Sequence, residues 1–202
     1  MPRTVDHAQR RATIAEALVR LAAREGLHAV TMRAVAAEAG VSLRLVQYYF
    51  ETKAALLHAT LLHLEEASHA RWRERLAGLS GPVPARRFVE ALLAEALPTD
   101  ERSRAFHLVW TSYAVLAMTE PDLAAQPFVA GPRRLEQQLT ATLREAAGEL
   151  AEDTDPAAEA ARLLALTHGL GTSVLVGQRT AASAEAVLRY HVDRLFTHRD
   201  HA

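Results

Sequence analysis

Residues 31–50 read TMRAVAAEAGVSLRLVQYYF, and this stretch decides the fold of the chain. Thr31 and Ser42 each precede a short helical pattern, and both are suitable N-caps because a hydroxyl can accept a hydrogen bond from the free N–H groups of a first turn. Gly40 lies between the two patterns and can adopt the positive φ of a tight turn without a steric penalty. The stretch therefore predicts two short helices joined by a tight turn, which is a helix-turn-helix.

The apolar residues of this stretch predict which sides of the two helices face inward. Val35 and Ala36 form the inner face of the first helix. Leu45 or Val46 packs inward from the second helix, together with Phe50. In a DNA-binding helix-turn-helix the second helix enters the major groove with its N-terminal end. The residues that we expect to bind DNA are Thr31, Arg33, Ser42, Leu43, Arg44, Gln47, Tyr48, Tyr49 and Lys53.

The side chains predicted to face DNA have the chemistry that this requires. Arg44 can form a bidentate pair with guanine, and Gln47 can do the same with adenine. The tyrosine and N-cap hydroxyls and the ammonium group of Lys53 are expected to bind phosphate, while Arg33 can reach either a phosphate or a base. The alternative interpretation is that the aromatic residues 48–50 are core residues of a helical packing that binds no DNA.

Over about residues 8–60 the chain resembles the N-terminal module of the tetracycline-repressor (TetR) family of transcriptional regulators. The family pattern is roughly Thr-x-x-x-Ile-Ala-x-x-Ala-Gly-Val-Ser-x-x-x-x-Tyr-x-Tyr-Phe-x-x-Lys-x-x-Leu. The matching residues are Thr31, Val35, Ala36, Ala39, Gly40, Val41, Ser42, Tyr49, Phe50, Lys53 and Leu56. The chain departs at Gln47, where the family usually has a tyrosine, and this makes Gln47 a candidate for base recognition. The resemblance implies a DNA-binding helix-turn-helix domain at 1–53 and an effector-binding and dimerisation domain at 54–202.

The remainder of the chain shows helical periodicity and no convincing strand pattern. Besides the two short helices, the patterns predict helices at about 8–24, 53–76, 85–97, 100–119, 133–150, 157–176 and 183–198. We expect segment 78–84 to be a linker, and segment 121–132, with its prolines and glycine, to be irregular or a short helical turn. The predicted fold class is all-α, with about nine helices.

The helix predicted over 100–119 carries a stripe of large side chains at spacings of three and four residues. The resemblance implies that such a helix lines an effector pocket, and the alternative is that the stripe is ordinary core. The candidate ligand-binding residues on this and neighbouring segments are Phe88, His107, Trp110, Tyr113, Phe128 and Gln137. Because several of them are large with a polar edge, we expect a small, largely apolar effector.

The last two predicted helices have broad apolar faces. The resemblance favours a homodimer in which these two helices from each chain form a four-helix bundle, and the alternative is a core within one chain. The residues that we expect at the dimer interface are Leu163, Thr167, Leu170, Gly171, Val174, Val187, Tyr190 and Arg194. A dimer would hold two recognition helices about 34–36 Å apart, as a palindromic operator requires.

Charge is divided unevenly between the two predicted domains. Residues 1–53 carry 8 Lys and Arg against 5 Asp and Glu, while the remainder carries 15 against 19, for a net charge of −1. A mildly basic N-terminal part on an acidic body is expected if only that part meets phosphate. The chain has no cysteine, no signal-peptide pattern and no apolar run near the roughly 20 residues of a membrane helix, so we expect a cytoplasmic protein.

The sequence gives little support to catalysis or metal binding. Ten histidines are present, but none has His-Glu-x-x-His spacing, and there is no Gly-x-Ser-x-Gly nucleophile elbow and no phosphate-binding glycine loop. We therefore expect neither an enzyme nor a cofactor or metal site.

The function predicted from the sequence is a repressor that binds a palindromic operator as a homodimer and is released by its effector. The alternatives are an activator, or a DNA-binding regulator without a small-molecule effector. A helical adaptor that binds no DNA is a more distant alternative.

Overall fold

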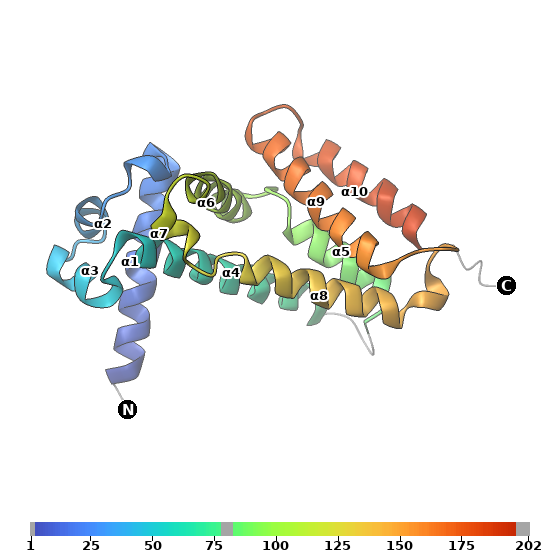
Figure 1. Cartoon of the computed structure of the whole chain (residues 1–202), viewed down its shortest axis with the longest axis horizontal. Helices are drawn as coiled ribbons and strands as arrows, with labels where there is room; N and C mark the ends of the chain where they lie inside the picture. The colour runs from blue at the N-terminus through green and yellow to red at the C-terminus, as the bar shows by residue number, and fades with distance from the viewer. Residues whose placement is uncertain (1–2, 78–82, 197–202) are drawn as a thin grey trace. The chain divides into compact units, whose positions relative to one another are not determined.

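The computed structural model describes residues 3–77 and 83–196, and Figure 1 shows that they form helices joined by short connections. The α-helices are α1 (Arg3–Glu25), α2 (Met32–Glu38), α3 (Leu43–Phe50), α4 (Lys53–Ala77), α5 (Ala85–Glu95), α6 (Glu101–Ala117), α7 (Pro121–Ala124), α8 (Ala130–Glu145), α9 (Pro156–Leu175) and α10 (Ala181–Leu195). Two short 3-10 helices lie at Leu27–Ala29 and Ala147–Glu149. These ranges hold no strand, which confirms the all-α class. None of the described helices combines the length with the apolar composition of a membrane-spanning segment.

Most of the predicted helices are confirmed, with boundaries that differ by a few residues. Segment 121–132 was predicted to be irregular or a short helical turn, and this was wrong for its last three residues, because α8 begins at Ala130 and includes Pro132. A proline is tolerated there because the N–H groups of a first helical turn have no partner within the helix. Residues 78–82 of the predicted linker, and the last residues of the predicted C-terminal helix, lie outside the described residues.

The chain divides into two compact units. Unit 1 consists of residues 1–67 and 108–128, and unit 2 consists of residues 68–107 and 129–202. Helices α4 and α6 therefore each have residues in both units. Unit 1 contains the helix-turn-helix and continues past residue 53, but the functional boundary at that residue stays a prediction.

Unit 1 has its own apolar core around one face of α1. Ile14, Leu18 and Leu21 follow one another at helical spacing, and all three are buried. The buried residues that join them in one cluster from the other elements include Val35, Val46, Phe50, Leu57, Leu61, Val109, Tyr113 and Leu123. Burial of each large apolar side chain stabilises the fold by about 1.5–3 kcal/mol. The helix-turn-helix is therefore held by a core to which α1, α4 and α6 also contribute.

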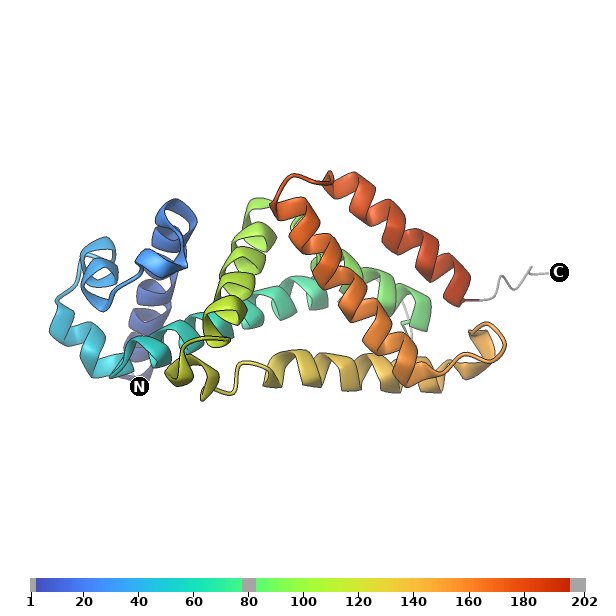
Figure 2. The same cartoon turned by 45° about the horizontal axis from the view of Figure 1, so that its top comes forward.

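Unit 2 has a second core, formed mainly by α5, α8, α9 and α10. Its buried members include Val89, Leu93, Leu139, Leu143, Leu163, Leu188 and Val192. Helix α9 packs against both α8 and α10, and α10 also contacts α5. Figure 2 shows α9 and α10, in orange and red, as neighbouring antiparallel helices joined by a short turn.

Candidate nucleic-acid interface

The turn between α2 and α3 has the geometry that the sequence predicts. Thr31 Oγ1 accepts a hydrogen bond from the backbone N–H of Ala34 at 3.1 Å, so Thr31 is the N-cap of α2. Gly40 has a φ of +67°. Its N–H donates to the carbonyl of Ala37 at 3.2 Å, while the N–H of Val41 donates to the carbonyl of Ala36 at 3.0 Å. This pair of bonds is the Schellman motif, which ends a helix with a left-handed residue.

The orientation of α3 about its own axis is set by two buried side chains. Val46 has no exposed surface, and Phe50 is almost completely buried in the core of unit 1. Ser42 caps this helix, because its hydroxyl oxygen accepts a hydrogen bond from the N–H of Leu45 at 3.2 Å. The prediction that Leu45 or Val46 faces inward is resolved in favour of Val46, since Leu45 is half-buried.

The predicted DNA-binding residues differ in exposure. Those with exposed side chains are Thr31, Arg33, Ser42, Arg44, Gln47 and Tyr48. Leu43, Tyr49 and Lys53 are half-buried. Tyr48 is 70% exposed although it is a large aromatic residue, which is unusual for a side chain with only a structural role. The base-reading and phosphate-binding roles of all nine residues stay predictions.

Helix α1 is tied to α2 by ion pairs. The guanidinium groups of Arg20 and Arg24 lie 3.1 and 2.9 Å from carboxylate oxygens of Glu38, near the end of α2. Hydrogen bonds from Arg24, and then from Arg20, hold the pKa of Glu38 below its ordinary value. Helical periodicity did not predict these contacts, because it cannot show which solvent-facing side chain meets a charged partner.

The end of α3 also contacts α1. The hydroxyl oxygen of Tyr49 lies 2.9 Å from Nδ1 of His7, and the backbone carbonyl of Tyr49 accepts a hydrogen bond from Nη1 of Arg11 at 2.8 Å. Tyr49, which was predicted to bind phosphate, therefore makes contacts within the protein through both its side chain and its backbone. The sequence analysis found neither His7 nor Arg11.

Three candidate effector-binding residues lie in unit 1. Tyr113 is fully buried, and its hydroxyl donates to the carbonyl of Leu123 at 3.1 Å. Burial raises the pKa of Tyr113 to about 12. The ring of Phe128 lies 5.1 Å from that of Tyr113, and both Phe128 and Trp110 are partly buried against the same core. The structure thus brings these three aromatic residues into one apolar region.

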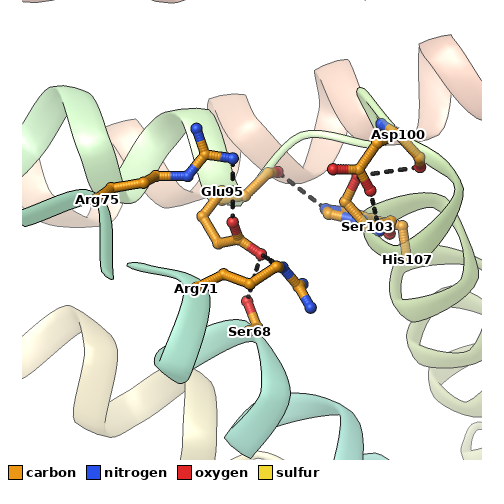
Figure 3. A network of polar contacts seen from close by, with 8 residues as sticks. Ser68, Arg71, Arg75, Glu95, Asp100, Ser103 and His107 are labelled. Carbon is orange, nitrogen blue, oxygen red and sulfur yellow. Dashed lines mark hydrogen bonds and ion pairs between the residues drawn. The ribbon is translucent and has the colours of Figure 1, made fainter. Parts of the chain in front are cut away.

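The other three candidates lie in unit 2, in different surroundings. Phe88 packs edge-on against Trp72, with ring centroids 4.9 Å apart, and Gln137 is exposed on α8. His107 is buried, and its two ring nitrogens lie 2.8 Å from the backbone carbonyl oxygens of Ser103 and Ala96 (Figure 3). His107 therefore contributes to the local structure of unit 2.

Figure 3 also shows a polar network beside His107 that the sequence analysis did not predict. Glu95 is almost completely buried, and its carboxylate accepts hydrogen bonds from Arg71 at 2.7 Å and from Ser68 at 3.2 Å. Arg75 lies 3.4 Å from the second carboxylate oxygen. Since a buried carboxylate needs a compensating charge, these arginines of α4 hold the end of α5 in place.

The residues predicted at a dimer interface divide into two groups. Leu163, Thr167, Leu170 and Gly171 are buried within a single chain, as the alternative interpretation expects. Gly171 has a local reason to be glycine, since a Cβ atom there would lie 3.1 Å from the ring of His107. Val174 and Val187 are half-buried, while Tyr190 and Arg194 are exposed. A role of these residues in dimerisation stays a prediction.

Two open grooves lie on unit 2. One, of about 560 Å³, runs between the start of α9 and the end of α10, and the other, of about 450 Å³, lies between α5 and α10. None of the six candidate effector-binding residues lines either groove. The grooves therefore give no support to those candidates.

Comparison with known protein families agrees with this geometry. Residues 14–60 match the family model of bacterial regulatory proteins of the tetR family, and residues 84–197 match the C-terminal model of BetI-type transcriptional repressors. The chain is similar to the HTH-type transcriptional regulator PksA of Bacillus subtilis (strain 168), with 28% identity over 87% of this chain and 83% of PksA. It is also similar to the HTH-type transcriptional regulator BetI of Burkholderia thailandensis, with 31% identity over 72% of this chain and 73% of BetI.

Solved structures give the same result for the fold. A TetR-family regulator from Rhodococcus sp. has a TM-score of 0.82 at 24% identity and covers 94% of this chain and 100% of its own. A transcriptional regulator from Saccharomonospora viridis, in complex with choline, has a TM-score of 0.80 at 26% identity and covers 95% of this chain and 100% of its own.

The positive φ of Gly40 leads to a prediction for the stability of the turn. Gly40→Ala should lower the stability of the protein by about 1–2 kcal/mol, because an alanine Cβ is strained in the left-handed region. Apart from its two chain neighbours, no residue has an atom within 4 Å of the added Cβ, so the loss would come from the backbone conformation. Gly40→Asn is the matched control and should lose less, since asparagine tolerates this region better. Equal losses for both variants in thermal unfolding would contradict the explanation.

Proposed function

The chain belongs to the tetR family of bacterial regulatory proteins, and on this basis we propose that it is a repressor that binds a palindromic operator as a homodimer and releases it when a small effector binds. Proteins of this family are DNA-binding transcriptional regulators and not enzymes. The observation that supports DNA binding most directly is the orientation of α3. Val46 and Phe50 anchor one side of this helix, and Arg44 and Gln47 are exposed outside that side.

In the proposed complex, α3 lies in the major groove and α2 lies next to the phosphate backbone. Arg44 binds guanine and Gln47 binds adenine, because each side chain offers the two hydrogen-bonding groups that the base edge requires. Tyr48 and Lys53 bind phosphates on either side, which sets the position of α3 but does not select a base sequence. This DNA-binding function is assigned to residues 1–53, and the functions of effector binding and dimerisation to residues 54–202.

The roles proposed for Arg44 and Lys53 differ in their effects on binding. Arg44→Ala should weaken operator binding by about 1–3 kcal/mol and relax the preference at one base pair, because one bidentate contact is lost. Lys53→Ala should weaken binding to every sequence and lower the salt slope by about 1, because one phosphate contact is lost. Arg102→Ala, at an exposed position of α6 in unit 2, serves as the control and should change neither property.

Anisotropy titrations of an operator duplex and an unrelated duplex, repeated at several salt concentrations, measure both effects. A loss for Arg44→Ala that is equal on the two duplexes, with an unchanged base preference, would make Arg44 a phosphate ligand instead.

The dimer is proposed to form through the exposed faces of α9 and α10. Beyond the first turn of α9 the exposed residues recur at helical spacing and are mostly small: Ala161, Ala165, His168, Gly169 and Thr172, with Val176 directly after the helix. Tyr190 and Arg194 extend the exposed face on α10, with the guanidinium group 5.6 Å from the centre of the tyrosine ring. Small side chains allow two helices to pack closely, and a symmetric pair of such faces would form a four-helix bundle.

A bulky charged residue at this face should prevent dimerisation. Ala165→Arg should convert the dimer to a monomer, because the guanidinium group would have to be buried without a partner. Ala141→Arg introduces the same side chain at an exposed position on α8 and should leave the dimer intact. Sedimentation velocity measures the outcome. A dimer that persists with Ala165→Arg would show that the interface lies elsewhere.

The effector is proposed to be a small molecule with a largely apolar surface. The partly buried rings of Trp110 and Phe128, beside the buried Tyr113, provide apolar and aromatic surface of the kind that such ligands contact. The regulator from S. viridis holds choline, a methylated cation, and aromatic rings can also bind such a cation. Choline is therefore a useful probe beside neutral aromatic compounds.

Thermal unfolding with benzyl alcohol, choline and citrate tests the chemical class of the effector. An effector at 100 times its Kd should stabilise the folded protein by about 2.7 kcal/mol, and Trp110→Ala should abolish the effect. We expect stabilisation by the neutral aromatic compound or by choline, together with weaker operator binding. Stabilisation confined to citrate or other highly charged metabolites would contradict an apolar effector.

Effector and operator are proposed to be linked through α4. Residues 53–67 of this continuous helix belong to unit 1 and residues 68–77 to unit 2, so a change in its tilt would affect both. Linkage requires each ligand to weaken the binding of the other by the same factor. An almost complete switch needs a difference in effector affinity of about 5 kcal/mol between the bound and released states.

A further inference from the structure

The C-terminal end of α3 is held by two side chains of α1 that lie on one face of that helix. His7 and Arg11 are four residues apart, which places them one above the other. Both contact Tyr49, His7 through the phenol oxygen at 2.9 Å and Arg11 through the backbone carbonyl at 2.8 Å. The rings of His7 and Tyr49 also meet edge-on, with their centroids 5.7 Å apart.

Arg11 makes a second contact, with the residue that anchors α3. Its guanidinium carbon lies 4.5 Å from the centre of the Phe50 ring, which is a cation–π geometry. One planar group thus contacts the ring of Phe50 while it donates a hydrogen bond to the carbonyl of Tyr49. The planar guanidinium group can stack on the ring while its edge donates, whereas the ammonium group of lysine has no planar face, so lysine should replace this arginine only in part.

The Tyr49 carbonyl lies at the C-terminal end of α3, where a positively charged donor is favourable. The last carbonyls of a helix have no partner within the helix, and they carry the negative end of its dipole. Helix α3 ends at Phe50, so Arg11 places a cation and a donor at that negative end. Helix α3 has only eight residues, so a contact at its last turn adds to the restraint that Val46, Phe50 and the Ser42 cap provide.

We propose that Arg11 is a positioning residue for base recognition, a role that rests on the proposed DNA-binding function. It fixes the C-terminal end of α3 against α1, and so fixes the direction in which Arg44 and Gln47 extend from the helix. Arg11 acts through α3 and not through a bond to DNA. Its removal should therefore affect the reading of bases and not the attraction to phosphate.

The test compares Arg11→Met and Arg11→Lys with the wild-type protein. Arg11→Met keeps an apolar side chain of similar length but loses the charge and the donors, while Arg11→Lys keeps the charge. Circular dichroism and the Tm establish that both variants are folded at the temperature of the binding assay. Affinity is then measured for the operator and for an unrelated duplex over a range of salt concentrations.

For Arg11→Met we expect the affinity for the operator to fall on the order of tenfold, which is about the loss expected when one base contact is removed. The affinity for the unrelated duplex should change little. The salt slope should stay as in the wild-type protein, and Arg11→Lys should recover only part of the loss. A loss that is equal on both duplexes with a smaller salt slope, or an unchanged affinity for the operator, would each overturn the proposal.

Hydrogen exchange in the free protein separates this proposal from the DNA-binding function itself. Arg11→Met should speed exchange at the backbone N–H groups of the last turn of α3, with unchanged exchange in α9. Unchanged exchange in α3 would overturn the positioning role whether or not DNA binds. If Arg11→Met speeds exchange in α3 but the wild-type protein binds no DNA, the positioning contact is real and the proposed DNA-binding function is wrong.

Discussion

The burial of Val46 and Phe50 on one side of α3 is the constraint on which the rest of the structure depends. In a helix of eight residues, two anchors one turn apart leave a single orientation about the axis. That orientation decides that Arg44 and Gln47 face solvent, where they can reach a base edge. The core of unit 1, the Schellman turn at Gly40 and the contacts from α1 all serve to keep these two anchors in place.

Features determined by local sequence could be predicted, and features determined by tertiary partners could not. Thr31, Gly40 and Ser42 act on their own neighbours in the chain, so their caps and turn were predicted correctly. The ion pairs of Glu38 with α1, and the contacts of Arg11, join exposed arginines to residues that are distant in sequence. Nothing in the helical periodicity of an exposed arginine shows which partner it will meet.

The C-terminal part of the chain illustrates a second limit of sequence patterns. An apolar stripe has the same appearance whether it is buried in its own chain or against a partner. Leu163, Leu170 and Gly171 are buried within one chain, and the small exposed residues of α9 are now the better candidates for an interface. Similarly, His107 was a candidate for an effector contact because of its polar edge, yet its ring nitrogens lie beside backbone carbonyls.

The central claim is that this chain reads DNA as a symmetric dimer, and selection from a random DNA pool tests it most directly. The purified protein is incubated with the pool at physiological salt, and bound sequences are recovered over several rounds. The account predicts a palindrome with half-sites about one helical turn apart, roughly 34–36 Å. No enriched sequence, from a protein shown to be folded and dimeric, would contradict the account.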